Sequence, residues 1–256
     1  MTAFLINLFS LEGRPALVTG ASSGIGRRLA LALAKAGAPV VAVARRADAL
    51  KTLCEEIEGE GGRAAPLPAD LSAGTCADVA AEAAKPFGPI RTLLNAAGVN
   101  LREPAADVTP ESFEKTLDIN LKTPFFLAKA LVPGMVAAGG GSIINFGSLQ
   151  STRALQNGLA YGASKGGVMQ LTRAMAREWS RDGVRANAIV PGFFPTELTA
   201  PVFRDDAVSA AHAAATAIGR NGALADLDGA AIFLAADASA YITGIGIPVD
   251  GGYLAK

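Results

Sequence analysis

The sequence predicts an α/β fold: a doubly wound parallel sheet of about seven strands, flanked by helices, in one domain that spans residues 1–256. The first observation is that short runs rich in β-branched residues alternate with longer stretches rich in alanine and leucine. Such alternation is typical of a parallel sheet with helical crossovers. The second is that the predicted strands are apolar on both faces, as they must be when helices cover both sides of the sheet. Since no linker or repeat interrupts the pattern, a single domain is favoured over two small ones.

The pattern places each strand and helix along the chain. Strands are expected at residues 15–19, 39–44, 64–67, 91–95, 142–146, 184–190 and 246–250. Helices are expected at residues 25–37, 47–61, 111–139 and 159–183. This order indicates a Rossmann-type fold, in which ligands bind where the carboxyl ends of the strands meet. The least regular segment, 191–225, is too polar and broken to form core and is predicted to be a substrate-binding lid.

Composition excludes several classes of protein. Lysine plus arginine balance aspartate plus glutamate at 23 each, so nothing indicates nucleic acid or an anionic membrane surface as partner. No apolar run reaches the ~18 residues of a membrane span, and the N-terminal segment lacks the basic start and cleavage site of a secretion signal. Cys54 and Cys76 form no CxxC pair, which favours a reduced, cytoplasmic protein. No His/Cys/Asp cluster indicates a metal, and His212 is expected to be solvated or to face a partner rather than to act in catalysis.

A glycine-rich turn follows the first predicted strand and opens the first predicted helix. Its sequence from residue 19 to residue 26 is TGASSGIG. A strand, such a turn and a helix N-terminus together present backbone N–H groups and a positive dipole end to a pyrophosphate. The expected cofactor contacts are Gly20, Ser22, Ser23, Gly24, Ile25 and Gly26. The alternative is that the glycines only serve a tight turn between strand and helix.

The end of the second predicted strand indicates which dinucleotide binds. An acidic residue at this point usually holds the free ribose hydroxyls of NAD(H), whereas a guanidinium suits a 2′-phosphate. The chain has no acid here and instead has Arg45 and Arg46. NADP(H) is therefore the predicted cofactor and NAD(H) the less favoured one. The alternative is that both arginines are merely solvated at a helix start.

Two further strand ends contribute to the predicted nucleotide site. Asp70 and Leu71 follow the third strand, where a carboxylate can accept a hydrogen bond from the adenine amino group, or else cap a helix. The fourth strand closes with Asn95, Ala96 and Gly98, whose small neighbours would allow an adenine or ribose to approach the backbone. A simple turn would accept the same residues.

The stretch YGASK places one of only three tyrosines four residues before a lysine. On a helix, Tyr161 and Lys165 then share one face. Ser148 ends the strand that precedes this helix, so its hydroxyl and the phenol are expected to meet over one carbonyl. Ser148 would donate to the substrate oxygen and Tyr161 would give or take the proton, with Lys165 favouring the phenolate. The alternative is a surface contact with no function.

These motifs together resemble the short-chain dehydrogenase/reductase superfamily from about Leu11 to the C-terminus. The matching motifs, in order, are TGASSGIG, NAAG, Asn120, Ser148, YGASK, PGFFPT and ITGIGIPVDGG. One departure is NAAG where NNAG is commoner. The resemblance implies that Lys165 also holds the nicotinamide ribose, and that Asn120 ties a water chain to that lysine. It further implies that Pro191, Gly192 and Thr196 clasp the carboxamide of the nicotinamide.

The substrate is less well defined by the sequence. Candidate pocket residues combine hydroxyl and amide groups with an aromatic wall: Ser148, Gln150, Asn157, Phe193 and Phe194. Such a pocket suits a small polar carbonyl or alcohol, and the resemblance favours gluconate 5-dehydrogenase-like members. The first alternative is a 3-oxoacyl-[acyl-carrier-protein] reductase, although residues 131–142 lack the basic side chains that an acidic carrier needs. The second is a non-catalytic nucleotide sensor, which the presence of all four catalytic positions disfavours.

Two predicted helices indicate self-association. Residues 111–137 and 159–182 carry apolar side chains on more than one face. A helix that is apolar beyond one stripe needs a second partner besides the sheet. The same helices of another subunit would provide it, which predicts a homodimer or a homotetramer.

Overall fold

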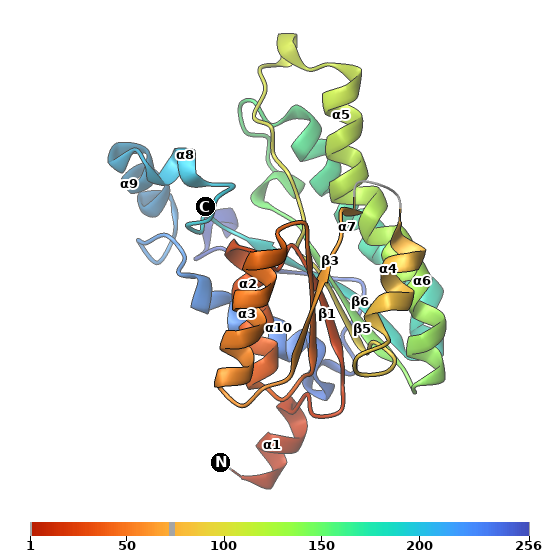
Figure 1. Cartoon of the computed structure of the whole chain (residues 1–256). Helices are drawn as coiled ribbons and strands as arrows, with labels where there is room; N and C mark the ends of the chain where they lie inside the picture. Colours follow the sequence, from red (N-terminus) through yellow and green to blue (C-terminus); the bar gives the residue numbers. More distant parts are fainter. Residues whose placement is uncertain (1, 72–74, 256) are drawn as a thin grey trace.

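In the computed structural model, which describes residues 2–71 and 75–255, seven parallel strands form one sheet (Figure 1). Their spatial order is β3-β2-β1-β4-β5-β6-β7. The strands are β1 (Ala16–Thr19), β2 (Val40–Ala44), β3 (Ala64–Pro68), β4 (Thr92–Asn95), β5 (Gly141–Phe146), β6 (Val184–Pro191) and β7 (Gly246–Val249). The order reverses between β1 and β4, and the crevice at such a switch point is where doubly wound sheets bind ligands. The predicted fold class is therefore confirmed.

Helices cover both faces of the sheet (Figure 1). One face carries α2 (Gly24–Lys35), α3 (Ala47–Gly59) and α10 (Asp228–Ala235). The other carries α4 (Cys76–Ala83), α6 (Thr123–Ala137) and α7 (Leu159–Trp179), and α5 (Pro110–Leu117) packs on α7. Successive residues of β1 divide between the two cores, with Val18 on the first and Leu17 on the second. The strands are apolar on both faces for this reason.

The long helix expected at residues 111–139 is not a regular α-helix. A single π-helical turn, Asp118–Lys122, joins α5 to α6. Such turns are rare and often occur at functional sites. Here the turn carries the buried Asn120, whose side chain is bonded to neighbouring elements rather than to its own helix.

The segment after β6 forms more structure than its composition suggests. It contains two helices, α8 (Ala200–Phe203) and α9 (Asp206–Ala215), which stand away from the sheet near the C-terminus (Figure 1). Phe194 and Val202 are buried, so the expectation that this region holds no core is wrong at these positions. Both side chains anchor the segment, whereas α9 itself buries no residue.

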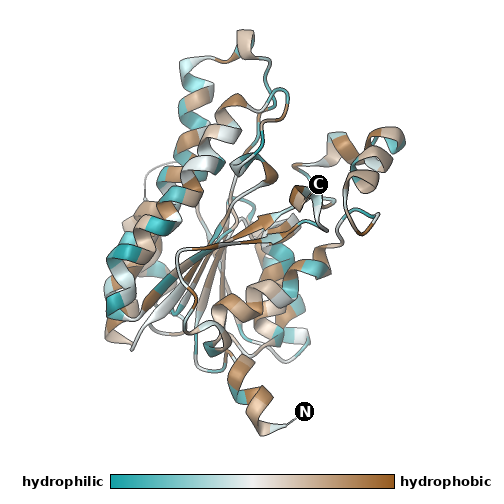
Figure 2. Cartoon of the chain, turned by 180° about the vertical axis from the view of Figure 1, so that it is seen from behind, coloured by the Kyte–Doolittle hydropathy of each residue, from teal (hydrophilic) through white to brown (hydrophobic). Residues whose placement is uncertain are grey.

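Apolar residues follow the strands and the inner faces of the helices (Figure 2). The short helix α1 (Ala3–Phe9) lies at the end of the molecule opposite α5 and buries none of its residues (Figure 1). Among the described residues, no helix is long and apolar enough to cross a membrane. Cys54 and Cys76 are both buried thiols, and burial raises the pKa of Cys54 to about 11.

Candidate active site

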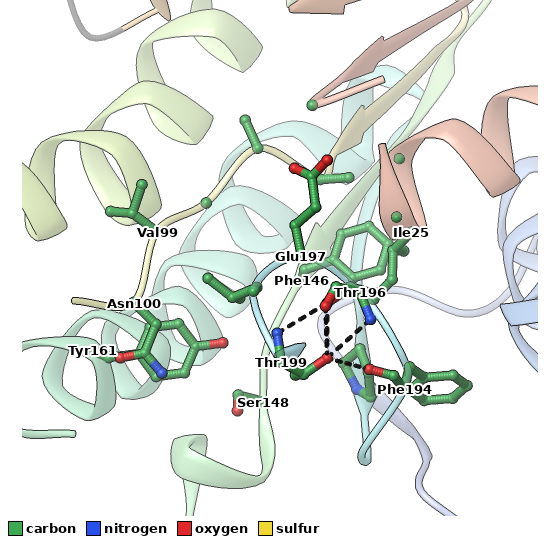
Figure 3. A pocket seen from close by; sticks show the side chains of 18 of the residues that line it. Ile25, Val99, Asn100, Phe146, Ser148, Tyr161, Phe194, Thr196, Glu197 and Thr199 are labelled. Atoms are coloured by element: carbon green, nitrogen blue, oxygen red, sulfur yellow. Dashed lines mark hydrogen bonds between the residues drawn. The ribbon is translucent and has the colours of Figure 1, made fainter. Parts of the chain in front are cut away.

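A cavity of about 940 Å³ opens at the carboxyl ends of the strands. It is lined by the glycine-rich turn, by the ends of β2 to β6 and by the segment after β6 (Figure 3). The predicted site residues that line it are Gly20, Ser22, Ser23, Gly24, Ile25, Gly26, Arg45, Arg46, Asp70, Leu71, Ala96, Gly98, Ser148, Gln150, Asn157, Tyr161, Lys165, Pro191, Gly192, Phe193, Phe194 and Thr196. Only Asn95 and Asn120 of the predicted set are absent from this lining.

Each glycine of the turn is required for a different reason. Gly20 has a φ of +67°, and a Cβ there would lie 2.9 Å from the backbone of Ala97. A Cβ on Gly26 would lie 2.4 Å from the carbonyl oxygen of Gly20, where no side chain fits. Gly24, with a φ of +55°, faces the methyl group of Thr196 at 3.2 Å from the position of its absent Cβ. The turn therefore exposes backbone N–H groups at the start of α2, which is the arrangement that binds a pyrophosphate.

The end of β4 combines a buried side chain with a loop that lines the cavity. Asn95 is buried, and its Nδ2 donates to Oδ1 of Asn145 on β5 at 2.9 Å. The Asn95 side chain is therefore used for pairing with β5, and the prediction that a nucleotide approaches the backbone of Asn95, Ala96 and Gly98 stays a prediction. Ala96 and Gly98 do line the cavity. The Thr19 hydroxyl fixes this loop by accepting from the Ala97 N–H at 3.0 Å.

Arg45 and Arg46 line the same end of the cavity but differ in their partners. Arg46 donates to both carboxylate oxygens of Glu197, at 2.9 and 3.1 Å, and to the hydroxyl of Ser22. Arg45 is exposed and has no hydrogen bond or ion pair to another described residue. Asp70 also faces the cavity. The alternative that it caps a helix at Ser72 concerns a residue outside the part of the chain that the structure describes.

At the other end, β5 and α7 bring Ser148, Tyr161 and Lys165 together. Ser148 lies two residues after the end of β5, where its hydroxyl accepts from the Gln150 N–H at 3.2 Å. Figure 3 shows the Tyr161 ring beside Ser148. Lys165 is buried, and its ammonium donates to the Phe146 carbonyl at 2.8 Å while lying 5.6 Å from the centre of the Tyr161 ring. A phenol, a hydroxyl and an ammonium thus meet at one wall of the cavity.

Burial is the largest influence on the ionisation of this group. It raises the pKa of the Tyr161 phenol, against smaller opposing effects from hydrogen bonding with Ser148 and from the charge of Arg102. Burial lowers the pKa of Lys165 to about 8. The charge of Lys165 is not among the causes of the raised pKa of Tyr161, and the prediction that Lys165 favours the phenolate stays a prediction. Tyr161 is kept as a neutral phenol, which is the form that protonates a carbonyl.

Asn120 supports the site without lining it. Its amide accepts from the Val99 N–H at 2.8 Å, and donates to the Val99 carbonyl at 2.9 Å and to the Ser164 hydroxyl at 3.0 Å. The Ser164 hydroxyl in turn donates to the carbonyl of Tyr161 at 2.7 Å. Asn120 thereby ties the loop after β4 to α7. The alternative of a bond back to its own helix is excluded by these partners.

The aromatic part of the substrate wall includes one residue that was not predicted there. The predicted Phe194 lines the cavity, and its ring is also buried against Gly222, where a Cβ would lie 2.4 Å from it. His212, expected to be solvated or to face a partner, instead lines the cavity and stacks on Phe193 with ring centres 3.7 Å apart. Burial and the charge of Arg102 lower the pKa of His212. No local pattern marked His212, because α9 reaches the site only through the tertiary fold.

Two residues at the substrate end of the cavity have strained backbone. Among the described residues, Arg102 (φ 54°) and Asn157 (φ 58°) are the only non-glycine residues in the left-handed region. Both line the cavity. The Asn100 side chain steadies the first turn by accepting from the Arg102 N–H at 3.3 Å. Strain of this kind is often retained at ligand sites.

Comparison with known proteins places this chain among enzymes. A family model described as enoyl-(acyl carrier protein) reductase matches residues 20–254. Gluconate 5-dehydrogenase of Gluconobacter oxydans (strain 621H) is 37% identical over 247 residues, which are 96% of each chain. D-Threitol dehydrogenase of Mycolicibacterium smegmatis is 38% identical over 252 residues, which are 97% of this chain and 95% of that one.

A solved structure agrees with the fold throughout. It is a gluconate 5-dehydrogenase from Burkholderia cenocepacia J2315 in complex with NADP and tartrate, with a TM-score of 0.94 and 37% identity over 98% of this chain and 99% of that one. The glycine-rich turn and the Ser/Tyr/Lys wall occupy one cavity of the same sheet. From this arrangement and these relatives, the chain belongs to the short-chain dehydrogenase/reductase superfamily and is an oxidoreductase.

Proposed function

We propose that this protein is an NADP(H)-dependent dehydrogenase that interconverts a ketone and a secondary alcohol on a small sugar acid or polyol. The single observation that supports this substrate class is the position of Arg102, a cation at the cavity wall. Its charge acts to lower the pKa of both the Tyr161 phenol and the His212 imidazole. A guanidinium in that position suits a substrate carboxylate. The related Burkholderia enzyme was crystallised with tartrate, a small hydroxy acid.

The cofactor assignment follows from the end of β2. Arg45 and Arg46 offer two guanidinium groups, and β2 itself ends without an acidic residue that would hold a free ribose diol. The Burkholderia relative binds NADP. The residues that would hold the cofactor are the glycine-rich turn, both arginines, Asp70 and Lys165, with Thr196 at the carboxamide. The cofactor supplies or accepts the hydride, and the protein supplies the proton.

The proton step is assigned to Tyr161. In the reducing direction Ser148 donates a hydrogen bond to the substrate oxygen, which polarises the carbonyl and fixes its position. Tyr161 then gives its proton to that oxygen as a general acid. The buried ammonium of Lys165, near the Tyr161 ring, stabilises the phenolate that remains. In the oxidising direction the same phenolate removes the proton from the alcohol.

The polar groups of the wall suit a substrate with several hydroxyls. Oε1 of Gln150 is buried, and no described residue donates to it. The Gln150 side chain as a whole lines the cavity and adds an amide group to its wall. Asn157 adds an amide, while the stacked rings of Phe193 and His212 provide a flat wall. These groups match a polyol chain better than a long acyl chain.

A 3-oxoacyl-[acyl-carrier-protein] reductase is the second candidate, since the matching family model carries an acyl-carrier-protein description. An acidic carrier requires free basic side chains at the cavity mouth. Of the three basic residues that could serve a carrier, Arg102, Lys122 and Lys129, Lys122 is paired with Asp118 and Arg102 lines the cavity itself. The non-catalytic alternative would leave the Ser148, Tyr161 and Lys165 arrangement without a use.

The experiment is a spectrophotometric screen with NADPH across keto sugar acids, neutral keto polyols and 3-oxoacyl thioesters. We expect the sugar acids to give the highest kcat/KM. In Arg102→Gln, the kcat/KM for a sugar acid should fall roughly 10- to 100-fold, the effect of losing one charge-assisted hydrogen bond. Turnover of a neutral polyol should change little and serves as the internal control. Preference for thioesters, or equal losses on both substrates, would contradict the proposal.

The exposed apolar surface of α6 bears on the oligomeric state. Of the apolar residues that suggested a second partner, Leu127, Leu131, Val168 and Met175 are buried within one chain, whereas Phe126 on α6 is 49% exposed. We infer that α6 and α7 pack against a second copy in a cytoplasmic homodimer or homotetramer. Light scattering that finds a 25.9 kDa particle would contradict this.

A further inference from the structure

An ionic bridge crosses the mouth of the cavity at its nucleotide end. Glu197 belongs to the segment after β6 and reaches the end of β2, where Arg46 donates to its two oxygens. The hydroxyl of Ser23 donates to the same carboxylate at 3.0 Å. Arg46 also donates to the hydroxyl of Ser22 at 3.0 and 3.1 Å. The glycine-rich turn, the end of β2 and the segment after β6 therefore meet at the Glu197 carboxylate.

The partners of Glu197 form an anion site. A planar guanidinium that donates two parallel hydrogen bonds, together with a neighbouring hydroxyl, is the arrangement that recognises a carboxylate or a phosphate. Arg46 is also one of the two arginines expected to hold a 2′-phosphate. The carboxylate of Glu197 thus occupies donors that a 2′-phosphate would use. Two anions cannot share these donors without repulsion.

The bridge is weak enough to be displaced. The side chains of Arg46 and Glu197 are 51% and 66% exposed, and exposed ion pairs contribute only about 0–1 kcal/mol. A phosphate carries more charge than a carboxylate and has three acceptor oxygens. Arg45, which has no partner among the described residues, would add a second cation to it. A 2′-phosphate should therefore displace the Glu197 carboxylate from Arg46, whereas a ribose hydroxyl should not.

The bridge also connects the two ends of the site. Glu197 directly follows Thr196, which packs on Gly24 and exchanges hydrogen bonds with Thr199. While Glu197 remains on Arg46, the segment is held against the glycine-rich turn. Its release would free residues 196–199 to rearrange around the nicotinamide end.

From this arrangement we propose that Glu197 is a cofactor-specificity residue that competes with the 2′-phosphate of NADP(H) for Arg46 and is displaced by it. This inference rests on the proposed cofactor. It predicts that Glu197 weakens NADPH binding but leaves NADH binding unaffected. It further predicts that the 2′-phosphate alone loosens the segment after β6.

The first experiment measures NADPH and NADH dissociation constants by fluorescence titration for the wild type, Glu197→Gln and Arg46→Gln. Glu178→Gln is the matched control, since Glu178 is an exposed glutamate on α7. Glu197→Gln should bind NADPH roughly 2- to 5-fold more tightly, the range that corresponds to losing one exposed ion pair. NADH binding should stay constant, and Glu178→Gln should match the wild type for both.

The second experiment uses hydrogen–deuterium exchange with two small probes. Adenosine 2′,5′-bisphosphate should increase exchange in residues 196–204, whereas adenosine 5′-monophosphate, which lacks the 2′-phosphate, should not. If Arg46→Gln weakens NADPH binding but Glu197→Gln leaves it unchanged, the cofactor proposal stands and the competition is refuted. If the wild type does not prefer NADPH to NADH, the cofactor proposal itself is wrong, and this inference with it.

Discussion

The two ends of the cavity are built by different kinds of structure. At the nucleotide end, the glycine-rich turn exposes backbone, and a Cβ on Gly20 or Gly26 would collide with other backbone atoms. At the substrate end, side chains define the surface: Tyr161, Arg102 and the stacked pair of Phe193 and His212. A site made of backbone depends on a few residues in one short stretch. A site made of side chains depends on elements brought together from distant parts of the chain.

This difference predicts how each end fails when it is mutated. Substitutions at the substrate end should remove chemistry while the cofactor still binds. Substitutions at the nucleotide end should affect binding and stability together, because the same atoms form the turn and the site.

The largest effect is expected at Tyr161. Tyr161→Phe keeps the ring and removes the proton donor, so kcat should fall by about 10²- to 10⁴-fold, the usual contribution of general acid–base catalysis. The NADPH dissociation constant should stay the same. Tyr241→Phe is the control, because Tyr241 is fully exposed and should tolerate the change. A Tyr161→Phe enzyme with near wild-type turnover would show that another group donates the proton.

The next effect concerns pH and Lys165. Below pH 8 this lysine is charged in both the folded and the unfolded state, so folding carries the full cost of burying an ammonium. Between its folded pKa of about 8 and its unfolded value of 10.5, only the unfolded state keeps the proton, and the folded state gains stability as pH rises. Relative to Lys165→Met, the wild type should gain on the order of 3 kcal/mol across this window.

Urea unfolding at pH 7.5, 9 and 10.5 would measure this gain. Lys129→Met is the matched control, because Lys129 is exposed on α6 and its variant should keep a constant difference from the wild type. A constant difference for Lys165→Met as well would contradict the low pKa of this lysine.

A smaller effect is expected from a methyl group in the glycine-rich turn. Gly26→Ala forces the turn to move by overpacking, which typically costs about 1–3 kcal/mol of unfolding free energy. NADPH binding should weaken in parallel. Gly134→Ala is the control: its Cβ would meet nothing within 4 Å on α6, so this variant should be more stable by about 0.5–1 kcal/mol. Thermal unfolding with and without NADPH would separate the two effects, and unaltered NADPH binding by Gly26→Ala would refute the role of the turn.

The smallest effect tests strain at the substrate end. Asn157→Gly removes the cost of a left-handed side chain and should stabilise the fold by less than about 1 kcal/mol. The KM should nevertheless rise, because the amide that faces the substrate is lost. A variant with increased stability and an unchanged KM would show that Asn157 only shapes the loop.

Much of this protein could be predicted from local patterns in its sequence. The strands lie within one or two residues of their expected bounds, because burial on both faces imposes a continuous apolar run. The glycine-rich turn and the Tyr161–Lys165 spacing are also local, since each depends on backbone geometry over a few residues. Local patterns did not show that the Asn95 side chain pairs with Asn145, because that contact joins two strands distant in the sequence.

Only the tertiary structure decided which distant side chains share the cavity. His212 reaches Phe193 because α9 folds back over the site, and Glu197 reaches Arg46 across 151 positions of sequence. The buried surroundings of Lys165, which lower its pKa, likewise exist only after folding. Local periodicity records which face of an element is apolar, but it carries no information about which elements meet. The sequence by itself therefore determined the fold and the catalytic groups. Tertiary packing decided which distant side chains line the cavity and how burial changes the pKa of Lys165.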